Sequence, residues 1–133
     1  MSMAALLFEA VTGLAVTFLT FHAAIEWGVL LHTLAGVALL VPTVWYCVAH
    51  WLDYRRQALS DTLLLGYVGL GGLLVCSLSG LVVTWQGLFG IRTSAIWRNA
   101  HLISTLLVLG AVLAHLVLAA WREIGRASCR ERV

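Results

Sequence analysis

The chain has 133 residues, of which 62% are hydrophobic and only 11% are charged, and its formal net charge is +2. Soluble domains are about 45–50% apolar, so this composition excludes an ordinary soluble domain and indicates an integral membrane protein. The small net charge provides no extended basic surface, and we expect the chain to contact membrane lipid and no nucleic acid.

Four apolar stretches along the chain predict four membrane helices, because a helix needs about 20 apolar residues to cross a bilayer. The predicted helices span residues 4–21, 27–51, 62–85 and 97–121. Five of the six tryptophans lie at the ends of these stretches, where an aromatic belt would place them: Trp27, Trp51, Trp85, Trp97 and Trp121. The fold expected is an all-α membrane protein, a four-helix transmembrane bundle that runs up-down-up-down.

The arginines set the expected orientation of this bundle. Arg55, Arg56 and Arg122 lie on one side, against Arg92 and Arg98 on the other. The positive-inside rule then places both termini in the cytoplasm. Because four spans alternate in direction, the second and fourth helices run parallel, and residues at similar heights on them can face each other.

The last eleven residues of the chain differ in character from the apolar sequence before them. Residues 123–133, "EIGRASCRERV", read as the in-frame translation of a short-read sequencing adapter rather than as protein. We therefore expect one transmembrane domain over residues 1–122 and a native C-terminus that is missing. Cys129 belongs to this tail, and the remaining Cys47 and Cys76 are expected to be small core residues of apolar helices.

Four of the five histidines fall in pairs on the second and fourth predicted helices. His101 and His115 are 14 residues apart, and His32 and His50 are 18 residues apart. At 3.6 residues per turn, both spacings are close to whole numbers of turns, so each pair lies on one face of its helix. His32 is then expected to face His101 near the outer surface, and His50 to face His115 near the inner one.

Facing imidazoles inside a membrane predict a cofactor, because buried ionisable residues are costly and usually functional. Two neutral imidazoles on opposite helices make the axial pair of a six-coordinate haem iron, so two levels predict two haem b groups. The axial separations are about 21 Å on the fourth helix and about 27 Å on the second, and we expect a bend at Pro42 to absorb part of this difference. The fifth histidine, His22, is expected at the membrane interface.

Small and basic residues near the histidines fit such a cofactor. Gly36 lies one turn after His32, and Gly110 lies between the two histidines of the fourth helix, where a porphyrin needs room. Arg98 shares the face of His101 and is placed to pair with a haem propionate. The third helix is rich in small residues, which favour either a porphyrin or tight helix packing: Gly66, Gly69, Gly71, Gly72, Ser77, Ser79 and Gly80.

The His-x3-Gly pattern, the 14-residue histidine spacing and the four-helix size together resemble the dihaem b-type cytochromes, over roughly residues 27–121. The spacing is that of the cytochrome b subunits of quinol-oxidising respiratory complexes, and the size is similar to that of the four-helix b-type anchors of bacterial membrane oxidoreductases. The resemblance implies that the axial, metal-binding ligands are His32, His50, His101 and His115. The chain departs from the family at His50, because the respiratory subunits have a shorter spacing on the second helix.

The resemblance also implies a function and a location. It favours electron transfer across the bacterial inner membrane, between the quinone pool and a redox partner such as a c-type cytochrome, by a subunit or module of an oxidoreductase. Two other classes stay open: a haem-free four-helix anchor or small transporter, and a transition-metal permease with histidines as stations. A transporter more often has discontinuous helices at mid-membrane, and a permease needs acidic or sulfur ligands.

Overall fold

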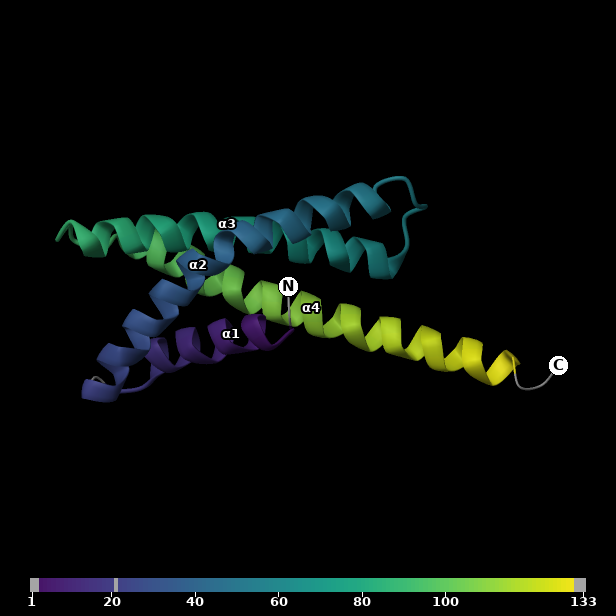
Figure 1. Cartoon of the computed structure of the whole chain (residues 1–133), viewed down its shortest axis with the longest axis horizontal. Coiled ribbons are helices and arrows are strands. Elements are labelled where there is room, and N and C mark those ends of the chain that lie inside the picture. The colour runs from purple at the N-terminus through teal and green to yellow at the C-terminus, as the bar shows by residue number, and fades with distance from the viewer. Residues whose placement is uncertain (1–2, 21, 131–133) are drawn as a thin grey trace.

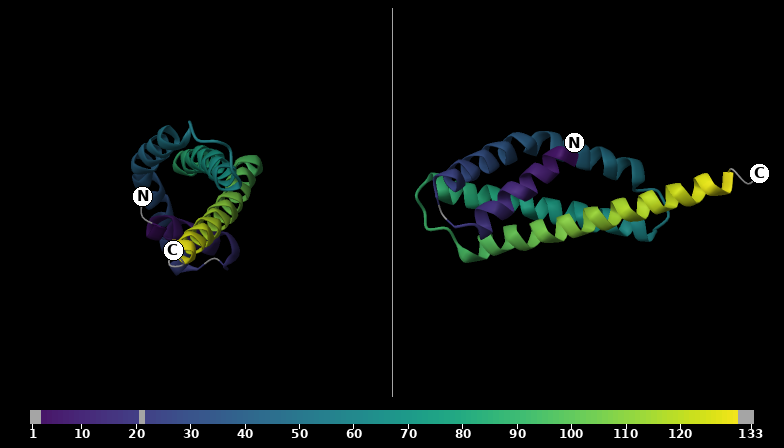
Figure 2. Two further views of the ribbon diagram at one scale, coloured as in Figure 1. Left: turned by 90° about the vertical axis from the view of Figure 1, so that its right-hand side faces the viewer. Right: turned by 90° about the horizontal axis from the view of Figure 1, so that it is seen from below.

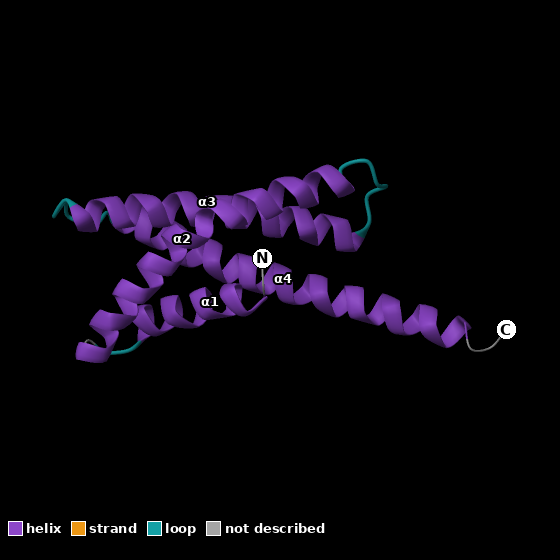
Figure 3. Cartoon of the chain, in the orientation of Figure 1, coloured by secondary structure: helices purple, strands orange, loops and turns teal. Residues whose placement is uncertain are grey.

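The computed structural model describes the backbone of residues 3–20 and 22–130 and the side chains of residues 4–20 and 22–122. All regular structure within these ranges is helical (Figures 1 and 3). The four helices are α1 (Met3–Phe18), α2 (Ala23–Tyr54), α3 (Asp61–Leu88) and α4 (Ala95–Arg130). The predicted all-α fold with four helices is therefore confirmed.

Three helices are long and apolar enough to cross a membrane: α2, α3 and residues Ala95–Arg122 of α4. The 16-residue α1 is shorter than the roughly 20 residues that a span needs. It ends at Phe18, earlier than predicted, in a stretch where Thr17 and Thr20 have low helix propensity. His22 then has an extended backbone and forms the N-cap of α2.

The helix α4 continues through the region in which the sequence predicts translated adapter. Its backbone is helical to Arg130, whereas the side chains of residues 123–130 and all of residues 131–133 lie outside the described part of the chain. The prediction that residues 123–133 are not native therefore stays a prediction.

The helix α2 is longer than predicted and contains Pro42 in its interior. Proline lacks the N–H that would bond to the carbonyl of the preceding turn, and its ring displaces that carbonyl. The ribbon of α2 changes direction about half-way along its length (Figures 1 and 2), as expected from the proline.

The helices pack in two pairs, α1 against α2 and α3 against α4, with a smaller contact between α2 and α3. Successive helices run in alternating directions, so α2 and α4 run the same way (Figure 1). The α3–α4 interface is built on small residues, including Gly72 and the buried hydroxyl residues Ser79 and Ser104. This packing of small residues is typical of membrane helices, whose backbones approach closely.

Very few apolar side chains are buried between the helices. Among the described residues, the buried hydrophobic ones are Ile25, Val108 and Ala111, while many large apolar side chains are exposed on all four helices. Soluble proteins do not expose apolar surface on this scale. The outer surface of the structure is therefore suited to lipid.

Candidate functional site

The first predicted histidine pair is brought together by α2 and α4. The ring centroids of His32 and His101 are 6.2 Å apart, and the ring planes are inclined by 66°. Two imidazoles that bind one metal from opposite sides have centroids about 6 Å apart, given metal–nitrogen bonds of about 2 Å. The spacing of this pair is therefore compatible with a shared metal centre.

The ring of His101 is fixed by α3. Its Nδ1 lies 2.9 Å from the backbone oxygen of Cys76 and 3.6 Å from the Cys76 Sγ. A carbonyl oxygen only accepts, so Nδ1 carries the proton and donates it. Gly80 makes room for the ring, because a Cβ at this position would lie 2.9 Å from the His101 Cε1.

The ring of His32 is fixed by α1 in the same manner as α3 fixes His101. Its Nδ1 lies 3.0 Å from Oε2 of Glu9 and 3.1 Å from Oγ1 of Thr12. The Thr12 hydroxyl donates to the backbone oxygen of Phe8 at 2.8 Å, so it accepts from Nδ1, which must be the donor. Gly13 lies against this ring, since a Cβ there would lie 3.0 Å from the His32 Cε1.

The ring of His115 is fixed near the start of α3. Its Nδ1 donates to the backbone oxygen of Thr62 at 2.9 Å. Gly66, one turn further along α3, lies beside the ring, because a Cβ added to this glycine would lie 3.7 Å from the His115 Cε1. His101 and His115 therefore use the same device: a backbone carbonyl of α3 holds Nδ1, and a glycine of α3 faces Cε1.

Three of the four predicted ligands thus share one tautomer. In each of His32, His101 and His115 the Nδ1–H is donated to an oxygen, and no hydrogen bond to Nε2 is found among the described residues. Metal-binding histidines almost always donate their second nitrogen in this way, which fixes the ring and leaves the other lone pair for the metal. The three rings fit the requirements of a haem ligand.

His50 is held differently from the other three. Its ring stacks on Tyr46, with centroids 5.6 Å apart and planes inclined by 15°, and contacts Tyr54 at 4.6 Å. Both contacts come from α2 itself, one turn before and one turn after the histidine. Aromatic stacking orients the ring, but it does not select which nitrogen carries the proton.

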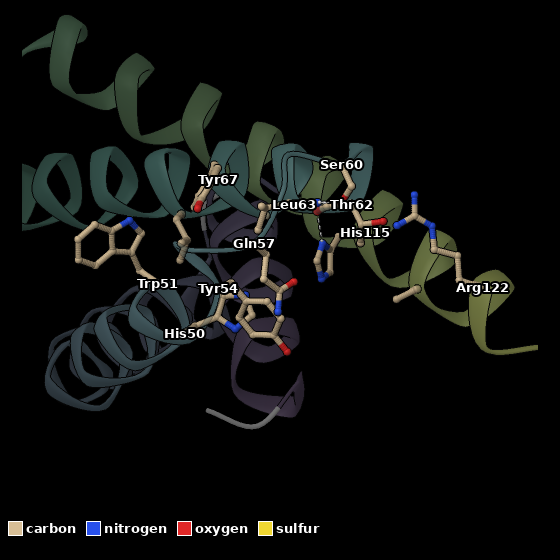
Figure 4. Close-up of a pocket in the computed structure, with 13 residues that line it drawn as sticks. His50, Trp51, Tyr54, Gln57, Ser60, Thr62, Leu63, Tyr67, His115 and Arg122 are labelled. Carbon is tan, nitrogen blue, oxygen red and sulfur yellow. Dashed lines mark hydrogen bonds between the residues drawn. The ribbon is translucent and has the colours of Figure 1, made fainter. Parts of the chain in front are cut away.

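His50 and His115 line the same two cavities, of about 290 and 190 Å³. Both cavities are also lined by Gly66 and Leu70 of α3. Figure 4 shows the larger cavity, with His50 and Tyr54 on one wall and His115 and Arg122 on another. The structure therefore places the second predicted pair around common space, although not in direct ring contact.

The other site residues proposed from the sequence differ in how they lie relative to the two histidine pairs. Gly36 faces Glu9, because a Cβ added to Gly36 would lie 3.4 Å from Oε2 of Glu9. Gly110 is exposed, and no heavy atom of another element lies within 4 Å of an added Cβ. Arg98 is exposed near the start of α4, three residues before His101, and His22 is exposed at the start of α2. Gly36 therefore makes room for the Glu9 carboxyl group, and the prediction that Gly36 and Gly110 make room for a porphyrin stays a prediction.

The glycines of α3 divide between the two interpretations of this helix. Gly66 and Gly80 face histidine rings, whereas Gly69 and Gly72 face side chains of α4, and Gly71 faces open space. The explanation by helix packing therefore holds for Gly69 and Gly72, whereas the explanation by a porphyrin stays a prediction for Gly66 and Gly80.

Sequence reasoning missed the contributions of α1 and of Arg122. Glu9, Thr12 and Gly13 hold His32, but the sequence analysis assigned none of them to the site. Their spacing of three and four residues places them on one helix face, which is the signal that was available. Arg122 served only to set orientation, whereas it lines the cavity of His50 and His115.

No group of three or more His, Cys, Asp or Glu side chains suited to a metal ion is found in the part of the chain that the structure describes. A bis-histidine haem needs only two such side chains. No protein-family model matches the chain, and comparison with curated proteins and with solved structures found no similar protein.

Proposed function

We propose that the protein is a membrane electron-transfer subunit that binds two haem b groups, one between His32 and His101 and one between His50 and His115. The observation that carries the proposal is the facing pair His32 and His101, with ring centroids 6.2 Å apart. Each ring donates Nδ1–H to an oxygen of a neighbouring helix, which leaves Nε2 for the iron.

The role of the chain is to hold and orient the cofactor. Each haem would supply a one-electron iron couple that helical side chains alone do not have. α2 and α4 contribute the ligands, while α1 and α3 fix the ligand rings from behind through Glu9 and the carbonyl of Cys76. A ligand that is already oriented loses little freedom when it binds metal, which favours tight binding.

The second site rests on the shared cavities of His50 and His115. The small residues Gly66 and Gly69 line the smaller cavity together with mainly apolar side chains from all four helices, and such a lining suits a flat apolar ligand. Arg122 lines the larger cavity and offers a guanidinium group to a carboxylate such as a propionate. This residue takes the role at the inner site that the sequence suggested for Arg98 at the outer one.

The wider setting of the proposal comes from the resemblance to dihaem cytochromes b. In this proposal all four helices span the bacterial inner membrane with both termini in the cytoplasm. The short α1 packs against α2, and local thinning of the bilayer accommodates its length. The electrons pass between the quinone pool and a redox partner such as a c-type cytochrome, within a larger oxidoreductase.

An optical spectrum tests the proposal directly. The protein, purified in detergent from cells that make haem, should give a reduced-minus-oxidised spectrum with a b-type α-band. Haem extraction should yield two non-covalently bound haems per chain. A purified, helical protein without a Soret band would instead favour the haem-free anchor or transporter.

A further inference from the structure

Among the described residues, the one ion pair to any of the four histidines is formed by the carboxyl group of Glu9. Its Oε2 lies 3.0 Å from Nδ1 of His32, and the two side chains are 20% and 24% exposed. The other oxygen, Oε1, is buried and has no hydrogen-bond partner among the described residues. A half-satisfied carboxyl group inside a membrane helix is costly, so its presence needs a functional reason.

The neighbours of Glu9 accommodate the carboxyl group. Gly36 of α2 lies opposite Oε2, at a position where a Cβ would come within 3.4 Å. Gly13, four residues after Glu9, leaves room for the ring that the carboxyl group contacts. Thr12 supports the same nitrogen with a hydroxyl group at 3.1 Å. One face of α1 is therefore shaped around the back of His32.

The partners of the other ligand rings are neutral. His101 and His115 both donate Nδ1–H to backbone carbonyls, and His50 contacts two tyrosine rings. A carboxyl partner makes an imidazole a stronger electron donor than a carbonyl partner does. Stronger donation stabilises the ferric state of an iron more than the ferrous state, which lowers the reduction potential.

The inner site has a basic side chain beside its histidines where the outer site has an acidic one. Arg122 lines the cavity that His50 and His115 share. A positive charge near an iron centre disfavours the oxidised, more positive state, which raises the reduction potential. The two sites are thus biased in opposite directions by residues on α1 and α4.

We infer that Glu9 is the positioning residue of His32 and makes the His32–His101 site the lower-potential of the two haem sites. The inference rests on the proposed function.

A redox titration of the purified holoprotein, followed at the α-band, tests the inference. Two one-electron waves are expected in the unaltered protein, and His101→Ala should remove the lower one. Glu9→Gln keeps the size and an acceptor oxygen but removes the acid. It should raise the midpoint potential of the lower wave by about 59 mV, which is a tenfold change in the one-electron reduction equilibrium constant, and leave the potential of the upper wave unchanged.

The controls separate charge from structure. Glu26→Gln makes the same chemical change at an exposed position of α2 and should move neither wave. Thr12→Val removes the neutral partner of the same nitrogen and should move the lower wave less than Glu9→Gln does. If Glu9→Gln holds only one haem, Glu9→Asp should restore the second, and failure to restore it counts against the inference.

The outcomes distinguish the inference from the function it rests on. Two haems whose potentials are unchanged in Glu9→Gln, or loss of the upper wave in His101→Ala, would overturn the assignment of Glu9 while leaving the dihaem function intact. An unaltered protein that binds no haem would overturn both.

Discussion

Replacing His101 with alanine is expected to halve the haem content of the purified protein, from two haems per chain to one. In the proposed function the substitution removes one of two axial ligands at the outer site, where the ring centroids of His32 and His101 are 6.2 Å apart. His115→Ala should likewise remove one haem, from the inner site, and the double variant should bind none. Haem per chain, measured from the reduced spectrum and the protein concentration, gives the result.

The matched control is His22→Ala. His22 is a histidine of the same chain that is exposed at the start of α2 and has no side-chain capping bond. Its loss should leave both haems bound. Circular dichroism of each variant shows whether the helices persist, so that lost haem is not confused with unfolding. If neither His101→Ala nor His115→Ala changes the haem content, the assignment of axial ligands is wrong.

The helices were predictable because the bilayer imposes a simple pattern on sequence. The three long helices overlap the predicted stretches 27–51, 62–85 and 97–121 and extend beyond them at both ends. Their apolar runs mark the membrane core, whereas the hydrogen-bonded helix continues into the interface. The sequence is less informative for α1, where Glu9, Thr12 and Thr17 interrupt the apolar pattern.

The facing of His32 and His101 was also predictable, from the regular rotation of a helix and the parallel run of α2 and α4. The partners of their Nδ1 atoms were not. The carbonyl of Cys76 and the carboxyl group of Glu9 come from helices whose rotation about their own axes depends on packing. A carbonyl acceptor in particular has no signature in sequence, because every residue has one.

Gly36 and Gly110 show what spacing along the chain leaves open about small residues. Both are predicted to make room for a porphyrin because of their distance from histidines along the chain. In the structure Gly36 lies against the Glu9 carboxyl group, and Gly110 has no neighbour within 4 Å of an added Cβ. A glycine marks a close approach or an absence of contact, and only the tertiary structure tells which.

Each helix that carries a proposed ligand packs against a partner helix, and in the proposed function this arrangement would explain a role for all four helices. α2 and α4 supply the imidazoles, but their rings are fixed by α1 and α3 respectively. The pairwise packing of α1 with α2 and of α3 with α4 thus follows the pairing of each ligand with its supporting group. A substitution on a supporting helix that leaves the histidine itself unchanged should therefore affect cofactor binding.

Gly80→Ala provides that disturbance and is expected to weaken haem binding at the outer site alone. The added Cβ would lie 2.9 Å from Cε1 and 3.1 Å from Nδ1 of His101, so the ring must move away from the Cys76 carbonyl. Overpacking of this kind costs about 1–3 kcal/mol, which corresponds to roughly five- to 150-fold in affinity. Titrating haem into the apoprotein should show one site unchanged and one site weakened by this factor.

Gly72→Ala is the matched control, because it creates an equally close contact in the same α3–α4 interface. Its Cβ would lie 2.7 Å from Leu107 Cδ2 and 2.9 Å from Val108 Cγ2, without touching a histidine. It should lower the thermal stability of the protein while both haem affinities hold in the folded fraction. Gly71→Ala, which meets nothing within 4 Å, should change neither property. Equal loss of haem in Gly72→Ala and Gly80→Ala would mean that general packing, rather than the position of the His101 ring, controls the site.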